Sequence, residues 1–194
     1  ERIKDMDADG VYGEVIYPTV GVALSRVKDP LLMNAICSAY NDWISEFCRP
    51  FPGRLKGIAM LNLDSIQVAV KEMERCATLG LSGALIPVYP PEEWGYDSPA
   101  YDPLWAAAQE LRMPLSLHVN TPLLIINSRY QGGHRKESTG PGPIHTTTQE
   151  KLETPSFRAN VDHWVRMSFA NMIFSGVFER FPTLTVGSIE MEMA

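Results

Sequence analysis

The stretch Pro114-Leu115-Ser116-Leu117-His118-Val119-Asn120 alternates strictly between apolar and polar side chains. Successive side chains of a β-strand point to opposite faces, so the three apolar residues share one face and Ser116, His118 and Asn120 share the other. In a barrel of parallel strands, one face packs on helices and the other faces the lumen. The alternation therefore predicts a barrel strand with His118 near its C-terminal end, where such barrels carry out their chemistry.

Strand and helix patterns alternate along the rest of the chain. Apolar runs predict five strands, at 13–18, 55–61, 83–88, 114–120 and 184–190. Helical periodicity predicts four helices between them, which open at Asp29, Asp64, Asp102 and Thr154, and residues 64–67 read as a capping box. This order predicts a parallel sheet, either doubly wound or part of a (β/α)8 barrel. No glycine-rich loop follows the first strand, which disfavours the nucleotide-binding doubly wound sheet.

Length and composition narrow the class of protein. The 194 residues are enough for one core, but a complete barrel of this type needs about 250. We therefore expect residues 1–194 to form a single partial barrel domain, cut from a longer protein. The net charge of −6 disfavours nucleic acid as a partner, and no apolar run approaches the roughly 20 residues of a membrane span.

The three cysteines, Cys37, Cys48 and Cys76, are odd in number and follow no metal-binding spacing. All three fall within helical patterns. This usage predicts reduced thiols and a cytoplasmic protein.

Several segments together resemble the amidohydrolase-related family, the group that contains aminocarboxymuconate-semialdehyde decarboxylase and related metal-dependent hydrolases and decarboxylases. The resemblance covers nearly the whole chain, in order. The segments that carry it are Tyr40-Asn41-Asp42-Trp43, Arg54-Leu55-Lys56-Gly57-Ile58-Ala59-Met60-Leu61, Asp102-Pro103-Leu104-Trp105, Ser116-Leu117-His118-Val119 and Phe174-Ser175-Gly176-Val177-Phe178-Glu179-Arg180-Phe181-Pro182.

The resemblance implies a (β/α)8 barrel with a divalent metal, most often zinc, with manganese as the alternative. The five strands then correspond to barrel strands two to six. His118 matches the fifth-strand metal ligand, and Glu190 lies at or near the sixth-strand catalytic position. In the family the first strand carries a His-x-His pair and the eighth an Asp. This sequence contains no His-x-His pair, and a catalytic zinc usually needs three protein ligands. Further ligands are therefore expected from outside these residues.

Three more residues are candidates for binding substrate. Asn120 follows His118 by two positions on the same strand face. Arg129 and Arg135 lie in the long connection 121–157, which we expect to close over the strand ends as a lid. A guanidinium in such a lid suits the geometry of a substrate carboxylate.

These features predict a metal-dependent hydrolase or non-oxidative decarboxylase acting on a small carboxylated or aromatic substrate. Two alternatives remain open. The chain could be a non-catalytic barrel remnant that acts through assembly, because missing strands would leave open sheet edges that a partner or a second copy must cover. We expect a homo-oligomer, most simply a dimer. The doubly wound sheet, binding a nucleotide or another anion at helix N-termini, is the second alternative.

Overall fold

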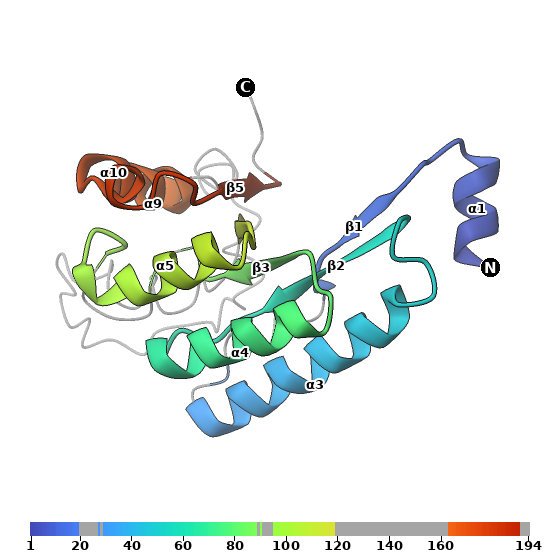
Figure 1. The fold of residues 1–194 in the computed structure, drawn as a ribbon, viewed down its shortest axis with the longest axis horizontal. Coiled ribbons are helices and arrows are strands. Elements are labelled where there is room, and N and C mark those ends of the chain that lie inside the picture. The colour runs from blue at the N-terminus through green and yellow to red at the C-terminus, as the bar shows by residue number, and fades with distance from the viewer. Residues whose placement is uncertain (20–26, 28, 89, 91–94, 119–162, 191–194) are drawn as a thin grey trace, which may run out of the picture.

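The computed structural model describes residues 1–19, 27, 29–88, 90, 95–118 and 163–190. The elements, labelled in Figure 1, are α1 (Arg2–Ala8), β1 (Glu14–Ile16), α3 (Pro30–Cys48), β2 (Leu55–Met60), α4 (Ile66–Thr78), β3 (Gly83–Ile86), η1 (Pro99–Tyr101), α5 (Asp102–Glu110), β4 (Leu115–His118), α9 (His163–Phe174), α10 (Val177–Arg180) and β5 (Val186–Ile189). All five predicted strands are confirmed. The predicted start of the last helix, at Thr154, lies outside the described residues.

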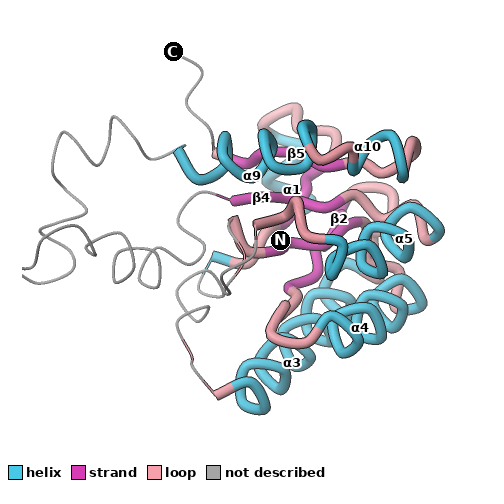
Figure 2. Tube along the Cα trace, turned by 90° about the vertical axis from the view of Figure 1, so that its left-hand side faces the viewer, coloured by secondary structure: helices cyan, strands magenta, loops and turns pink. Residues whose placement is uncertain are grey.

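The five strands form one parallel sheet in the order β1-β2-β3-β4-β5. A doubly wound sheet reverses its strand order at a switch point, whereas here each strand pairs with the next along the chain. Crossovers between parallel strands share one hand, so an unreversed order places the helices on one side of the sheet. Figures 1 and 2 show α3, α4, α5 and α9 along the outside of a curled sheet. The half-barrel is confirmed and the doubly wound alternative is wrong.

The core lies between the sheet and these helices. Leu115 and Leu117 of β4 are fully buried, as are Ile44 of α3, Met73 of α4 and Trp105 of α5. All five belong to one apolar cluster. The predicted alternation in β4 therefore holds, with its apolar residues turned toward the helices.

Helix α3 begins as the sequence predicts, and α4 does not. The Asp29 carboxylate accepts hydrogen bonds from the backbone N–H groups of Leu31 (2.9 Å) and Leu32 (3.2 Å). In α4 the N-cap is Ser65, whose side chain makes no capping hydrogen bond. Its hydroxyl lies 3.4 Å from the side-chain oxygen of Gln67 instead. The predicted capping box is therefore wrong, because these two side chains contact each other rather than the backbone.

All three cysteines are buried and unpaired, as predicted. Burial, and then the negative charge of Glu72, raise the pKa values of Cys37 and Cys76 to about 12. Burial also raises the pKa of Cys48. Thiols held in their protonated form are poor nucleophiles and poor metal ligands, so the cysteines belong to the core rather than to a site.

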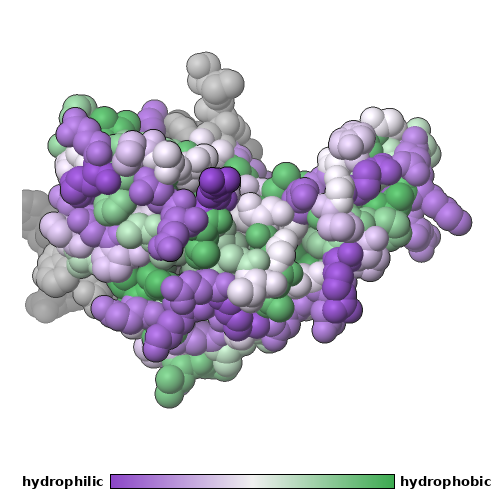
Figure 3. All heavy atoms as spheres, viewed as in Figure 1, coloured by the Kyte–Doolittle hydropathy of each residue, from purple (hydrophilic) through white to green (hydrophobic). Residues whose placement is uncertain are grey.

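The face seen in Figure 3 is mostly hydrophilic, with an apolar patch over the first turn of α3. Leu31 and Leu32 are 81% and 53% exposed in that turn. Among the helices that the structure describes, none is both long and apolar enough to cross a membrane.

The α3–α4 contact predicts a pH-dependent contribution to stability from Glu72. Its carboxylate accepts two hydrogen bonds from Arg75 (2.7 and 2.9 Å) and one from Asn41 (2.8 Å). Burial opposes ionisation, but these bonds and the Arg75 charge outweigh it and lower the pKa of Glu72. A lowered folded-state pKa stabilises the fold above the unfolded-state value, and this stability is lost as the pH falls through the folded-state value.

We therefore expect Glu72→Gln to lower the free energy of unfolding by about 1.5–3 kcal/mol at pH 7. The difference from the wild type should narrow below about pH 4.3, where glutamate protonates in the unfolded chain. Urea denaturation across this pH range measures both. The exposed Glu74 on the same helix provides the control, because Glu74→Gln should change stability by no more than about 0.5 kcal/mol. A pH-independent difference for Glu72→Gln would contradict the prediction.

The close pairing of β3 and β4 makes Gly83 sensitive to substitution. A Cβ at this position would lie 2.9 Å from the Pro114 carbonyl oxygen and 3.1 Å from Cδ1 of Ile58. We expect Gly83→Ala to destabilise the fold by about 1–3 kcal/mol, because the neighbouring strand cannot move away without losing its pairing. A Cβ at Gly187 of β5 would meet nothing within 4 Å, so Gly187→Ala should be neutral or stabilising. Thermal melts of the two variants test this contrast.

Candidate active site

His118 and Glu190 meet where β4 and β5 end. The parallel register pairs His118 with Ile189, so Glu190 follows directly at the same edge of the sheet. Nε2 of His118 lies 3.5 Å from Oε2 of Glu190. The His118 side chain is only 12% exposed and that of Glu190 is 68% exposed. The two residues that the sequence singles out for chemistry are therefore brought together.

The backbone of Glu190 departs from the strand that precedes it. Its φ of +58° lies in the left-handed region, which residues other than glycine seldom adopt. Conformations of this kind persist where the surroundings hold them, and they concentrate at functional sites. The turn re-aims the Glu190 side chain, whose direction the alternation of β5 alone leaves open.

Tyr17 and Ser116 form a second contact beside His118. The hydroxyl of Tyr17, which follows β1, lies 2.9 Å from Oγ of Ser116 in β4. The rings of Tyr17 and His118 are 6.5 Å apart between centroids and inclined by 53°. Ser116 is 5% exposed, so the hydrogen bond satisfies a buried hydroxyl. Tyr17 contributes more to this site than the sequence indicates.

The His118–Glu190 pair has a spacing that suits two ligands of one ion. Two ligand atoms that each lie about 2.1 Å from a metal at a tetrahedral angle are about 3.4 Å apart. Imidazole nitrogen and carboxylate oxygen are both ligands of zinc and manganese. Within the described part of the chain, no group of three or more His, Cys, Asp or Glu side chains could hold a metal. These residues therefore offer two donors, fewer than the three that a catalytic zinc usually has.

The other predicted site residues cannot be placed. Asn120, Arg129 and Arg135, like the whole predicted lid 121–157, lie outside the described residues. Their assignment to substrate binding stays a prediction.

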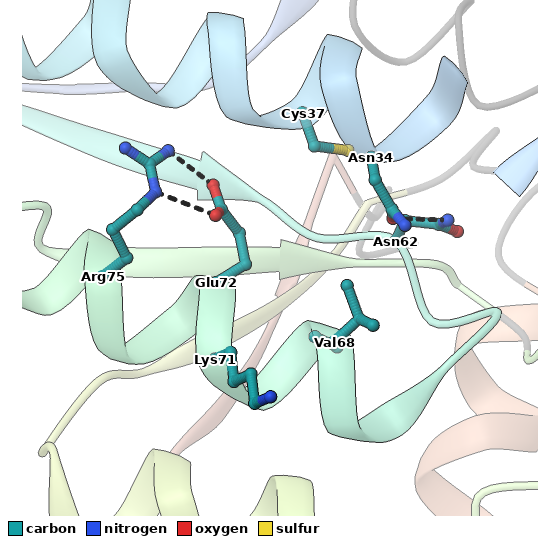
Figure 4. Close-up of a pocket in the computed structure, with 8 residues that line it drawn as sticks. Asn34, Cys37, Asn62, Val68, Lys71, Glu72 and Arg75 are labelled. Carbon is teal, nitrogen blue, oxygen red and sulfur yellow. Dashed lines mark hydrogen bonds and ion pairs between the residues drawn. The ribbon is translucent and has the colours of Figure 1, made fainter. Parts of the chain in front are cut away.

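A hollow of about 220 Å³ lies elsewhere, between α3 and α4. Figure 4 shows the amides of Asn34 and Asn62 hydrogen-bonded at one end and the Glu72–Arg75 ion pair at the other. Neither His118 nor Glu190 lines it. Its one carboxylate, Glu72, is already paired with Arg75, and the hollow lacks a histidine–carboxylate pair like the one at the ends of β4 and β5.

Comparison with known proteins places the chain in a family. The amidohydrolase family model matches residues 2–194. The chain belongs to the amidohydrolase family. The resemblance inferred from the sequence is thereby confirmed, and the half-barrel agrees with it.

Relatives within the amidohydrolase family are decarboxylases. Gamma-resorcylate decarboxylase from a Rhizobium species is 33% identical over 139 residues, which cover 69% of this chain and 42% of the relative. The enzyme of the same name from a Polaromonas species is 27% identical over 191 residues, which cover 95% of this chain and 53% of the relative. This chain thus spans about half the length of its relatives.

Solved structures of amidohydrolases show the same arrangement. The 2,6-dihydroxybenzoate decarboxylase from Rhizobium matches with a TM-score of 0.71 and 26% identity, over 96% of this chain and 54% of that one. A 2,6-dihydroxybenzoate decarboxylase in complex with 2,6-dihydroxybenzoate matches with the same values. A dihydroxybenzoic acid decarboxylase from Polaromonas matches in fold, with a TM-score of 0.72 and 24% identity over 96% of this chain and 52% of that one. That structure contains bound manganese and an inhibitor, 2-nitroresorcinol. The chain therefore has the fold of part of such a barrel.

Proposed function

We propose that the protein is a metal-dependent, non-oxidative decarboxylase of a small aromatic carboxylate. The observation that carries this proposal is the His118–Glu190 pair, 3.5 Å apart at the C-terminal ends of two adjacent strands in an amidohydrolase barrel. Decarboxylation is favoured over hydrolysis because the relatives are dihydroxybenzoate and gamma-resorcylate decarboxylases. The chain spans about half their length, so the activity is proposed for the protein that contains it.

In this proposal His118 is a metal ligand through Nε2, and its partly buried position limits competition from water. A bound divalent ion would polarise a substrate oxygen and stabilise negative charge beside it. Glu190 delivers a proton from its carboxyl group to the ring carbon that bears the carboxylate. The bond from that carbon to the carboxylate then breaks, its electron pair restores the aromatic ring, and CO2 leaves. Asn120, Arg129 and Arg135 are proposed to bind the substrate.

Two metals, zinc and manganese, are candidates for this site. The imidazole of His118 is a ligand that suits zinc and manganese alike. Structural neighbours with bound manganese support manganese at least as well as the zinc expected from the family resemblance. Either ion agrees with the proposed role of His118.

Metal analysis and a product assay test the function together. Elemental analysis of protein purified without chelator should find about one zinc or manganese ion per chain. Incubation with 2,6-dihydroxybenzoate should then release CO2 and resorcinol, while benzoate, which lacks the hydroxyl groups, should not react. No metal and no CO2 after addition of either ion would exclude the proposal. It would favour the non-catalytic barrel remnant, most clearly if the protein were a stable dimer.

We also propose that the protein is a homodimer in the cytoplasm. Exposed aromatic side chains on and just after α3 support assembly: Trp43, Phe47 and Phe51 are 54%, 39% and 46% exposed. Three unpaired thiols support a reducing compartment. Light scattering after size exclusion measures the assembly, and a monomer at working concentration would contradict it.

A further inference from the structure

A single side chain joins the first and fourth strands of the sheet. Tyr17 follows β1, and its hydroxyl lies 2.9 Å from Oγ of Ser116 in β4. Strands β2 and β3 separate these two strands in the sheet. In a flat sheet, three strand spacings amount to about 14 Å. The contact therefore crosses the inside of the curl, the side opposite the helices.

The same side chain lies against His118. Ser116 precedes His118 by two positions and faces the same way, so a tyrosine bound to Ser116 lies beside the imidazole. The two ring centroids are 6.5 Å apart. Nε2 of the same imidazole lies 3.5 Å from Oε2 of Glu190. The imidazole therefore has both a phenol ring and a carboxylate as neighbours.

We propose that Tyr17 is a positioning residue, which holds the His118 imidazole with Nε2 directed at Glu190. This inference rests on the proposed function, because the orientation matters for the metal that His118 would bind. The hydrogen bond to Ser116 fixes the phenol, and the fixed phenol restricts rotation of the imidazole about its side-chain bonds. Partners that orient a ligating histidine typically change metal affinity by about 10–100-fold when they are removed.

Three variants distinguish the contribution of the Tyr17 ring from that of its hydroxyl. Tyr17→Leu removes both, Tyr17→Phe keeps the ring, and Ser116→Ala removes the partner of the hydroxyl. Calorimetric titration of metal-free protein with Mn²⁺ should show a dissociation constant raised about 10–100-fold in Tyr17→Leu. Tyr17→Phe and Ser116→Ala should each have a smaller effect, and their double variant should be no worse than the weaker-binding single variant.

Nuclear magnetic resonance of the metal-free protein provides a second measurement. In the wild type, the ring protons of His118 should show one conformer, shifted by the neighbouring phenol. In Tyr17→Leu that shift should vanish and the signals should broaden as the ring samples several rotamers. Tyr12 is 84% exposed, so Tyr12→Leu is a matched control that should leave both measurements unchanged.

The outcomes distinguish a failure of this inference from a failure of the proposed function on which it rests. If His118→Ala abolishes Mn²⁺ binding but Tyr17→Leu only lowers the melting temperature, Tyr17 stabilises the fold without orienting His118. The inference is then overturned. If the wild type binds neither Mn²⁺ nor Zn²⁺, the proposed function fails. The His118 signals still decide the role of Tyr17 in that case. Where Tyr17→Leu does not fold, Tyr17→Phe decides, because loss of the hydroxyl should still change the His118 signals relative to the Tyr12→Leu control, and unchanged signals would overturn the inference.

Discussion

Replacing His118 by alanine is expected to remove the bound metal and nearly all decarboxylase activity. In the proposed site His118 is a direct ligand, so its loss should exceed the roughly 10–100-fold effect typical of residues that only orient a ligand. We expect activity to fall by about 1,000-fold or more, together with less than one ion per chain by elemental analysis. His118 stands at the end of β4 and outside the apolar cluster, so the melting temperature in the absence of metal should change little.

The control for this variant is another histidine. His163 lies at the start of α9, where its ring meets Trp164 edge-on at 5.0 Å between centroids. His163→Ala should keep both the metal and the activity. Retention of metal and activity in His118→Ala would instead leave His118 as a buried histidine of the barrel wall.

Glu190→Gln separates the two roles that a carboxylate could have beside His118. As the proton donor, Glu190 should be needed for turnover but not for holding the ion. We therefore expect metal content to persist while kcat falls by about 100–10,000-fold, the usual contribution of general acid–base catalysis. Simultaneous loss of metal would make Glu190 a ligand instead, and full activity would contradict both roles.

The strands and helices could be predicted from the sequence because their signals are local. The alternation in β4 and the proline after Asp29 each act within a few residues, and both are found as expected. The choice between a barrel and a doubly wound sheet is different in kind, because it depends on which strands pair. The order in which the strands pair decides between the two sheets, and no single segment of the sequence encodes that order.

The candidate site could be predicted only in part for the same reason. His118 stood out by its place at a strand end. The contact between Tyr17 and Ser116 joins residues 99 positions apart, through a curl that arises only when all the strands are assembled. One signal was present: a small polar residue two positions before a histidine, on an otherwise polar strand face. It marks the position but does not identify the partner.

Asn41 shows how a residue can matter to the fold without a local signal. It is fully buried in α3 and makes three hydrogen bonds. Its side-chain amide donates to the Met60 carbonyl (3.1 Å) and to Glu72 (2.8 Å), and its side-chain oxygen accepts from the Met60 N–H (2.8 Å). Strand β1 pairs with β2 only over Leu55–Gly57. The Asn41 side chain thus bonds the backbone of Met60 as a neighbouring strand would, at a position of β2 beyond its described pairing with β1.

Asn41→Ala is accordingly expected to lower the free energy of unfolding by about 3–5 kcal/mol, the largest stability loss predicted for this chain. The substitution leaves the N–H and C=O of Met60 buried without these partners and removes one hydrogen bond from Glu72. Urea denaturation at pH 7 measures the loss. Asn34→Ala on the same helix, which removes one partly buried bond to Asn62, should cost only about 1 kcal/mol. If Asn41→Ala lowered the free energy of unfolding by no more than Asn34→Ala does, the hydrogen bonds between Asn41 and Met60 would contribute little. The end of β2 would then be held by apolar packing alone.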